Sequence, residues 1–108
     1  MLNPKISAYL GFCIKSGNLT MGFNAVETIK KGVYLLVVCH TASENSRKQA
    51  SKLQQKFGCP LIVCEGDTLE NIVKKPLCKF AAVRDKKLAQ ALLAVTQEGF
   101  RAETGGNN

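Results

Sequence analysis

Residues that suit phosphate binding are concentrated between Ser16 and Lys31, in the segment SGNLTMGFNAVETIKK. The pattern indicates a loop, a short strand and a helix that begins at Gly22, where a glycine lets another backbone approach closely. The first turn of a helix carries unpaired N–H groups and the positive end of the dipole, which favour an anion. Helical spacing places Asn24, Thr28 and Lys31 on one polar face, which could grip a nucleic acid. An ordinary solvated helix with a glycine at its turn accounts for the same pattern.

The cysteines and the histidine are the other reactive side chains, and their spacing does not indicate a site. Zinc ligands usually come in pairs two to four residues apart, and no C-x-x-C pair is present, so we expect no bound metal. The odd number of cysteines and the absence of a secretory signal favour reduced thiols. Cys39 and His40 are adjacent, but neighbouring side chains on a strand point to opposite faces and cannot form a dyad. The chain also lacks a phosphate loop and a recognisable carboxylate pair, so we expect no catalytic residue and no cofactor.

Three continuous apolar runs, separated by segments of helical periodicity, indicate the elements that must position these residues. The runs are YLLVVC at Tyr34–Cys39, LIVC at Leu61–Cys64 and FAAV at Phe80–Val83. Such runs are typical of strands buried on both faces of a parallel sheet. The alternation predicts an α/β fold, a three-layer α/β/α sandwich with a small, mostly parallel central sheet. We expect residues 1–98 to form a single domain and residues 99–108, which end in GGNN, to form a flexible tail.

The charge balance indicates the class of partner. Fifteen Lys and Arg residues against eight Asp and Glu residues leave a net charge of +7, and the pI is about 9.3. A small basic protein attracts polyanions, and nucleic acid is the commonest of these in a cytosol. No apolar run has the length of a membrane span, and the N-terminus lacks the layout of a signal peptide. We therefore expect a cytoplasmic monomer that binds nucleic acid and not a membrane.

The segment SGNLTMGFNAVETIKKGVYLLVVCHTASENSRKQ resembles the L-seven-Ae and L-thirty-e family of kink-turn RNA-binding ribosomal proteins, most closely its small bacterial YlxQ-type members. The shared pattern is a first helix that ends in S-G, a four-residue bridge, a glycine that opens the second helix, an apolar strand, and a polar A-S-E-N-type start of the third helix. The resemblance covers roughly residues 4–96. It implies an α/β/α sandwich and a non-enzymatic, ribosome-associated protein that binds structured RNA, such as a kink-turn.

The resemblance also implies where RNA binds, namely at the start of the second helix and the loop before the fourth helix. Gly22 matches the glycine whose backbone meets RNA, and Asn24 keeps an amide that can both donate and accept at a base edge. The expected RNA contacts are Gly22, Phe23, Asn24, Thr28, Lys31, Lys15 and Lys30. Glu27 lies four residues before Lys31, a spacing that allows an ion pair between them.

Three positions depart from the family pattern. Ala25 stands where many members have Glu or Gln, and Thr28 stands where many have Lys. The familiar L-G-x-A becomes Leu69-Glu70-Asn71-Ile72, so that Glu70 replaces the glycine that makes room for a splayed-out base. Ala25 and Glu70 favour an alternative function, a protein–protein interaction module on the same fold with a degenerate RNA site, whereas the net charge of +7 speaks against it.

Overall fold

The computed structural model describes residues 4–64, 69–95 and 100–103, in which five helices and five strands occur. The helices are α1 (Pro4–Lys15), α2 (Phe23–Glu27), α3 (Glu44–Phe57), α4 (Leu69–Val73) and α5 (Lys86–Ala94). The strands are β1 (Leu19–Met21), β2 (Leu35–Cys39), β3 (Leu61–Cys64), β4 (Phe80–Val83) and β5 (Phe100–Glu103). The three strands expected from the apolar runs are confirmed, with β2 beginning one residue later than expected.

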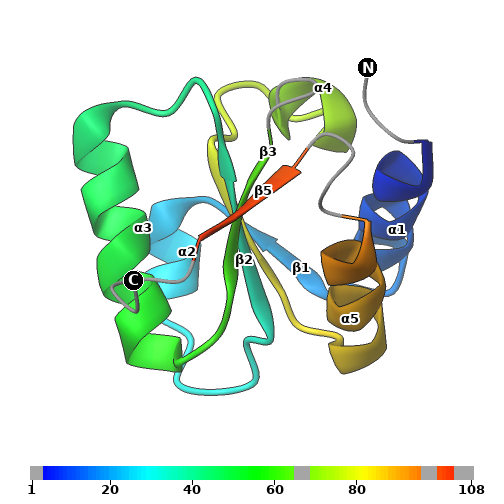
Figure 1. Ribbon diagram of the computed structural model, residues 1–108, viewed down its shortest axis with the longest axis horizontal. Helices are drawn as coiled ribbons and strands as arrows, with labels where there is room; N and C mark the ends of the chain where they lie inside the picture. The colour runs from blue at the N-terminus through cyan, green and yellow to red at the C-terminus, as the bar shows by residue number, and fades with distance from the viewer. Residues whose placement is uncertain (1–3, 65–68, 96–99, 104–108) are drawn as a thin grey trace.

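The strands form one sheet in the order β1-β4-β2-β3-β5. Strands β2 and β3 are parallel, whereas the β1–β4, β2–β4 and β3–β5 pairs are antiparallel. We call the end of the sheet where β2 ends at Cys39 and β4 begins at Phe80 the upper end. The lower end is the opposite one, where Leu35 of β2 pairs with Val83 of β4. The two ends are the top and the bottom of Figure 1.

The expectation of a mostly parallel sheet is wrong, and the lengths of the crossover helices explain why. The 14 residues of α3 span about 21 Å, enough to return the chain to the lower end, so β3 starts beside the start of β2. The five residues of α4 span only about 8 Å, and the chain stays at the upper end. Strand β4 therefore starts at the upper end and runs antiparallel to β2 (Figure 1).

Helices cover both faces of the sheet, which confirms the α/β/α sandwich (Figure 1). Helices α2 and α3 pack on one face, and α1, α4 and α5 pack on the other. Alternate residues of β2 belong to the two cores, with Leu35 and Val37 beneath α1 and α5, and Leu36 and Val38 beneath α2 and α3. All five residues of β2 are buried, as expected for a central strand.

Strand β5 lies inside the segment where we expected a flexible tail. Residues Phe100–Glu103 pair with β3 and cover an edge that would otherwise leave backbone N–H and C=O groups of a buried strand unpaired. The tail expectation is therefore wrong for these residues, while residues 96–99 and 104–108 lie outside the described ranges. None of the helices in the described ranges is long and apolar enough to cross a bilayer.

Candidate nucleic-acid interface

Gly22 fixes the start of α2 against the sheet. Its φ of 93° lies in the left-handed region that favours glycine. Its N–H donates to the carbonyl of Phe80 at 2.8 Å, and its carbonyl accepts from the N–H of Val26 at 3.1 Å. The Gly22 N–H is therefore already bonded within the protein. No side chain in the described part of the chain caps the start of this five-residue helix.

Phe23 positions this helix start. Its ring stacks on the ring of Phe80, with centroids 4.3 Å apart and planes at 4°. The side chain is partly buried and packs against the core beneath α2 and α3. The next residue, Asn24, is exposed, and no hydrogen bond of its amide is seen among the described residues. The stacked pair thus presents the Asn24 amide at the upper end of the sheet.

Helix α2 is shorter than the sequence predicts, and this separates its polar residues. The helix ends at Glu27, where Thr28 is the C-terminal cap and donates its hydroxyl to the carbonyl of Ala25 at 2.7 Å. A hydroxyl that bonds the local backbone competes with helix propagation. The expectation that Asn24, Thr28 and Lys31 share one helical face is therefore wrong, since Lys31 lies in the loop that follows.

The expected pairing of Glu27 with Lys31 is also wrong. The Glu27 carboxylate accepts from the side-chain amide of Gln49, and its backbone carbonyl accepts from Lys56 Nζ at 2.8 Å. Both partners lie on α3, so Glu27 joins α2 to α3. The ammonium group of Lys31 is exposed and is not neutralised by Glu27.

The residues expected to contact RNA lie at both ends of the sheet. Gly22, Phe23 and Asn24 are at the upper end, where Gly22 bonds to Phe80. The lysines are at the lower end, because Arg84, which follows β4, bonds through its guanidinium to the carbonyls of Lys31 and Gly32 at 3.4 and 3.2 Å. The Arg84 N–H also donates to Asn18, just after α1, at 2.7 Å. The structure therefore does not bring Lys15, Lys30 and Lys31 to the Asn24 site.

The loop between α4 and β4 contributes residues that sequence reasoning missed. It leads into Phe80, the partner of Gly22 and Phe23, and it exposes Lys74, Lys75 and Leu77. Leu77 is 85% exposed, and Lys74 and Leu77 have φ values of 59° and 62°, a strained conformation for residues with side chains. The sequence signal was the basic run KKPLCK. We call Asn24, Lys74, Lys75, Leu77 and the first turn of α2 the upper surface.

Glu70 does not leave an unpaired negative charge near this surface. Its carboxylate forms an ion pair with Lys79 at 2.9 Å, and both side chains are partly buried. Lys79 also donates to the Thr41 hydroxyl at 2.8 Å. The pair neutralises Glu70 and joins α4 to the residue before β4.

The thiols are not placed for chemistry. All five cysteines are buried, and none is disulfide-bonded in the described part of the chain. Burial raises the pKa of Cys13 and of Cys59 to about 11, and Asp85 adds to the effect at Cys13. His40 Nδ1 lies 2.8 Å from the Cys64 carbonyl, while Cys39 Sγ lies 3.0 Å from the Thr41 hydroxyl, so the adjacent Cys39 and His40 have different partners, as strand geometry predicts. No group of three or more metal-ligating side chains occurs among the residues described.

The chain is similar in structure to a protein of unknown function from Bacillus halodurans. The two share 20% sequence identity with a TM-score of 0.72, and the match covers 89% of this chain and 100% of the other. At this identity the likeness shows the fold alone. Comparison with protein families and with curated proteins found no match.

Proposed function

We propose that this chain is a non-enzymatic, cytoplasmic RNA-binding protein that holds structured RNA at its upper surface. The observation that carries the proposal is the exposed Asn24 amide at an uncapped helix start, at the same end of the sheet as a loop that exposes two lysines and Leu77. An amide can read a base edge, the lysines can contact phosphates, and a leucine can pack against an unstacked base. The resemblance to kink-turn binders adds the expectation of a kinked stem, of ribosomal RNA as the target and of association with the ribosome.

In the proposed mechanism, different groups supply the affinity for RNA and the selectivity among RNAs. Phosphate contacts would supply most of the affinity, because the family's polar side chains at Ala25 and Thr28 are missing and Thr28 instead bonds its own backbone. Asn24 would supply the preference for one RNA shape. Binding should therefore weaken steeply with added salt and show a modest preference for a kinked stem over a plain duplex.

The direct test is recovery of RNA from cells. The tagged protein is crosslinked by ultraviolet light in the cell and purified with and without nuclease, and the attached RNA is sequenced. We expect structured, mainly ribosomal RNA whose yield falls for a Lys74→Gln/Lys75→Gln variant and not for a Lys48→Gln/Lys52→Gln control on α3. RNA recovery no higher than from an untagged strain would refute the proposed function.

One observation favours protein binding as the second candidate. Leu77 is almost fully exposed in a strained backbone, which suits a contact with an apolar partner surface as well as with a base. The same purification distinguishes the two functions. A stoichiometric protein that remains after nuclease treatment and is lost with Leu77→Gln would replace RNA as the partner.

A further inference from the structure

Three segments that are far apart in the sequence meet at the lower end of the sheet. They are residues 15–18 after α1, residues 30–34 before β2 and residues 83–87 between β4 and α5. The Arg84 N–H donates to the Asn18 carbonyl at 2.7 Å, and the Tyr34 N–H donates to the Val83 carbonyl at 3.0 Å. The Arg84 guanidinium bonds to the carbonyls of Lys31 and Gly32. These bonds fix the three segments relative to one another.

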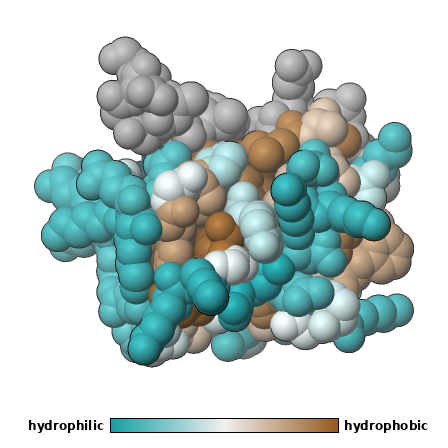
Figure 2. All heavy atoms as spheres, turned by 90° about the horizontal axis from the view of Figure 1, so that it is seen from below, coloured by the Kyte–Doolittle hydropathy of each residue, from teal (hydrophilic) through white to brown (hydrophobic). Residues whose placement is uncertain are grey.

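The three segments carry six cations and one carboxylate, Asp85. The Asp85 side chain is already used, because it accepts the Leu88 N–H at 3.0 Å as the cap of α5. All six cationic side chains are exposed, and Figure 2 shows this end of the molecule, where hydrophilic side chains project around a smaller apolar area. We call these residues the lower surface, namely Lys15, Lys30, Lys31, Arg84, Lys86 and Lys87.

Two of these cations, Lys86 and Lys87, are unfavourably placed for folding. Lys86 and Lys87 occupy the first turn of α5, which contains no acidic residue. A cation at the positive end of the helix dipole is unfavourable, and the Asp85 cap offsets only part of the charge of Lys86, Lys87 and Arg84. Residues that break a local rule of stability are expected at functional or strained sites, so the placement of Lys86 and Lys87 favours a role in binding.

Tyr34 adds an aromatic side chain to this charged surface. It is 42% exposed, and its backbone is joined to Val83, the residue before Arg84. An aromatic ring among cations is the combination that binds single-stranded nucleic acid, because bases stack on the ring while the cations hold the phosphates.

We propose that the lower surface is a second RNA-binding surface, which holds a single strand that flanks the stem at the upper surface. The inference rests on the proposed function for the class of ligand, but not on the upper surface for its location. Since the two surfaces lie at opposite ends of the sheet, a short isolated stem would reach only one of them. A stem with a single-stranded extension would reach both and would bind more tightly.

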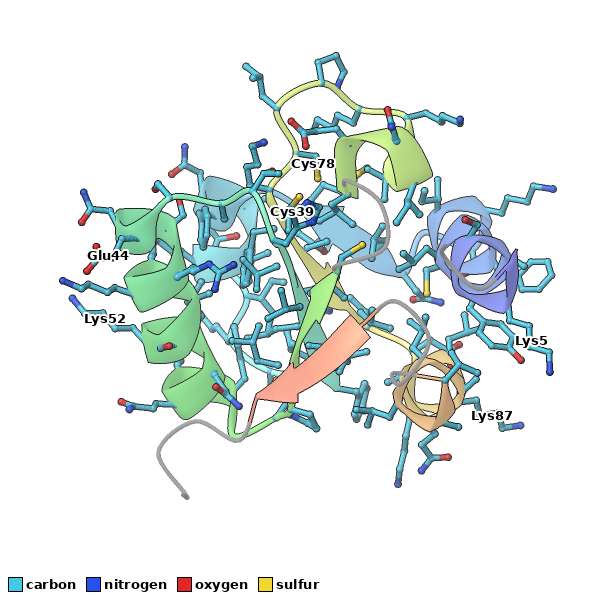
Figure 3. All side chains as sticks on the ribbon, turned by 45° about the horizontal axis from the view of Figure 1, so that its top comes forward. Lys5, Cys39, Glu44, Lys52, Cys78 and Lys87 are labelled. Carbon is cyan, nitrogen blue, oxygen red and sulfur yellow. The ribbon has the colours of Figure 1, made fainter. Side chains whose placement is uncertain are left out.

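The test compares double variants that each remove two charges. The loop variant is Lys30→Gln/Lys31→Gln, and the helix variant is Lys86→Gln/Lys87→Gln. The control variant is Lys48→Gln/Lys52→Gln on α3, from which Figure 3 shows Lys52 projecting away from the sheet. All these side chains are exposed, and Arg84 bonds only to backbone in the 31–32 loop, so the substitutions leave those bonds in place. Circular dichroism confirms that each variant is folded.

Fluorescence anisotropy measures binding to a stem with and without a single-stranded extension, over a series of salt concentrations. For the extended RNA, the loop and helix variants should each lose about ten-fold in affinity at about 0.1 M salt, and the salt slope should fall by about one to two units. Tyr34→Ala should lose about five-fold or more on the extended RNA only, whereas Tyr34→Phe should bind like the wild type. The control variant should change less than the loop and helix variants do.

The outcomes separate this inference from the proposed function. If the wild type binds RNA but the loop and helix variants match the control variant, the lower surface is not an RNA surface, and the proposed function stands. If those two variants lose affinity while Asn24→Ala changes nothing, the lower surface stands and the upper surface fails. Two further results would overturn the inference. One is that the wild type does not bind RNA. The other is that the loop and helix variants keep their RNA affinity and lose only their binding to vesicles of phosphatidylserine and phosphatidylcholine.

Discussion

Replacing Lys86 and Lys87 by glutamine should stabilise the protein while it weakens RNA binding. Each cation in the first turn of a helix costs about 0.3–1 kcal/mol through the helix dipole. Asp85, the cap of α5, offsets about one of the two charges. We therefore expect the free energy of unfolding of the double variant to rise by about 0.3–1 kcal/mol. Lysine and glutamine have similar helix propensities, so propensity does not explain a difference.

Urea unfolding followed by circular dichroism measures the change. With an m-value of about 1.5 kcal/mol/M, the midpoint should rise by about 0.2–0.7 M urea. The gain is electrostatic, so it should shrink at about 0.5 M salt, where the Debye length is about 4 Å. The Lys48→Gln/Lys52→Gln control should show no gain, because Lys48 lies 3.8 Å from Glu44 in an i,i+4 pair.

The double variant should be more stable and should bind RNA more weakly. A merely structural role of Lys86 and Lys87 would not produce this combination. A lower midpoint at low salt would refute the dipole reasoning. A higher midpoint with unchanged RNA affinity would show that the charges are unfavourable for folding but are not used for binding.

Three further changes give separate predictions. Asn24→Ala should remove the preference for a kinked stem, at a cost of about 1–3 kcal/mol on that RNA only, as measured by anisotropy with kinked and straight stems. Phe23→Ala should lower the free energy of unfolding by about 2–3 kcal/mol in urea, less than for a fully buried ring because Phe23 is partly exposed; no loss would contradict its anchoring role. Burial raises the pKa of Cys13 and of Cys59 from 9.0 to about 11 in the folded state. Between pH 9.0 and about pH 11, these thiols therefore ionise in the unfolded state only. Stability should then fall by about 1.4 kcal/mol per pH unit for each thiol over this range, and Cys13→Ala/Cys59→Ala should flatten the alkaline limb of a stability–pH curve.

Local features of the fold were predictable because residues close in sequence determine them. Apolar runs indicated the buried strands, and Asp85, a residue type that favours the start of a helix, caps α5 by accepting the Leu88 N–H. Gly58 ends α3 in the left-handed conformation, which glycine adopts readily. The local sequence around the start of α3 offers two hydroxyl residues, and Ser43 is the one that caps the helix, while Thr41 bonds to Lys79 and Cys39.

Local sequence did not predict the direction of β4. It also did not predict that the expected RNA-binding residues lie at two opposite ends of the sheet. Both depend on where short helices stop, and α4 and α2 are each five residues long. An apolar run has the same composition in either strand direction, so FAAV could not indicate an antiparallel strand. The early end of α2 at Thr28 placed Lys30 and Lys31 in a loop at the lower end, away from Asn24.

The most direct test of RNA binding is a titration of the wild-type protein with a kinked and a straight stem at several salt concentrations. We expect binding to both at low salt, a modest preference for the kinked stem, and an affinity that falls with salt at a slope of about one unit for each phosphate contacted. If the protein binds neither RNA even at low salt, its basic surfaces are not RNA-binding surfaces.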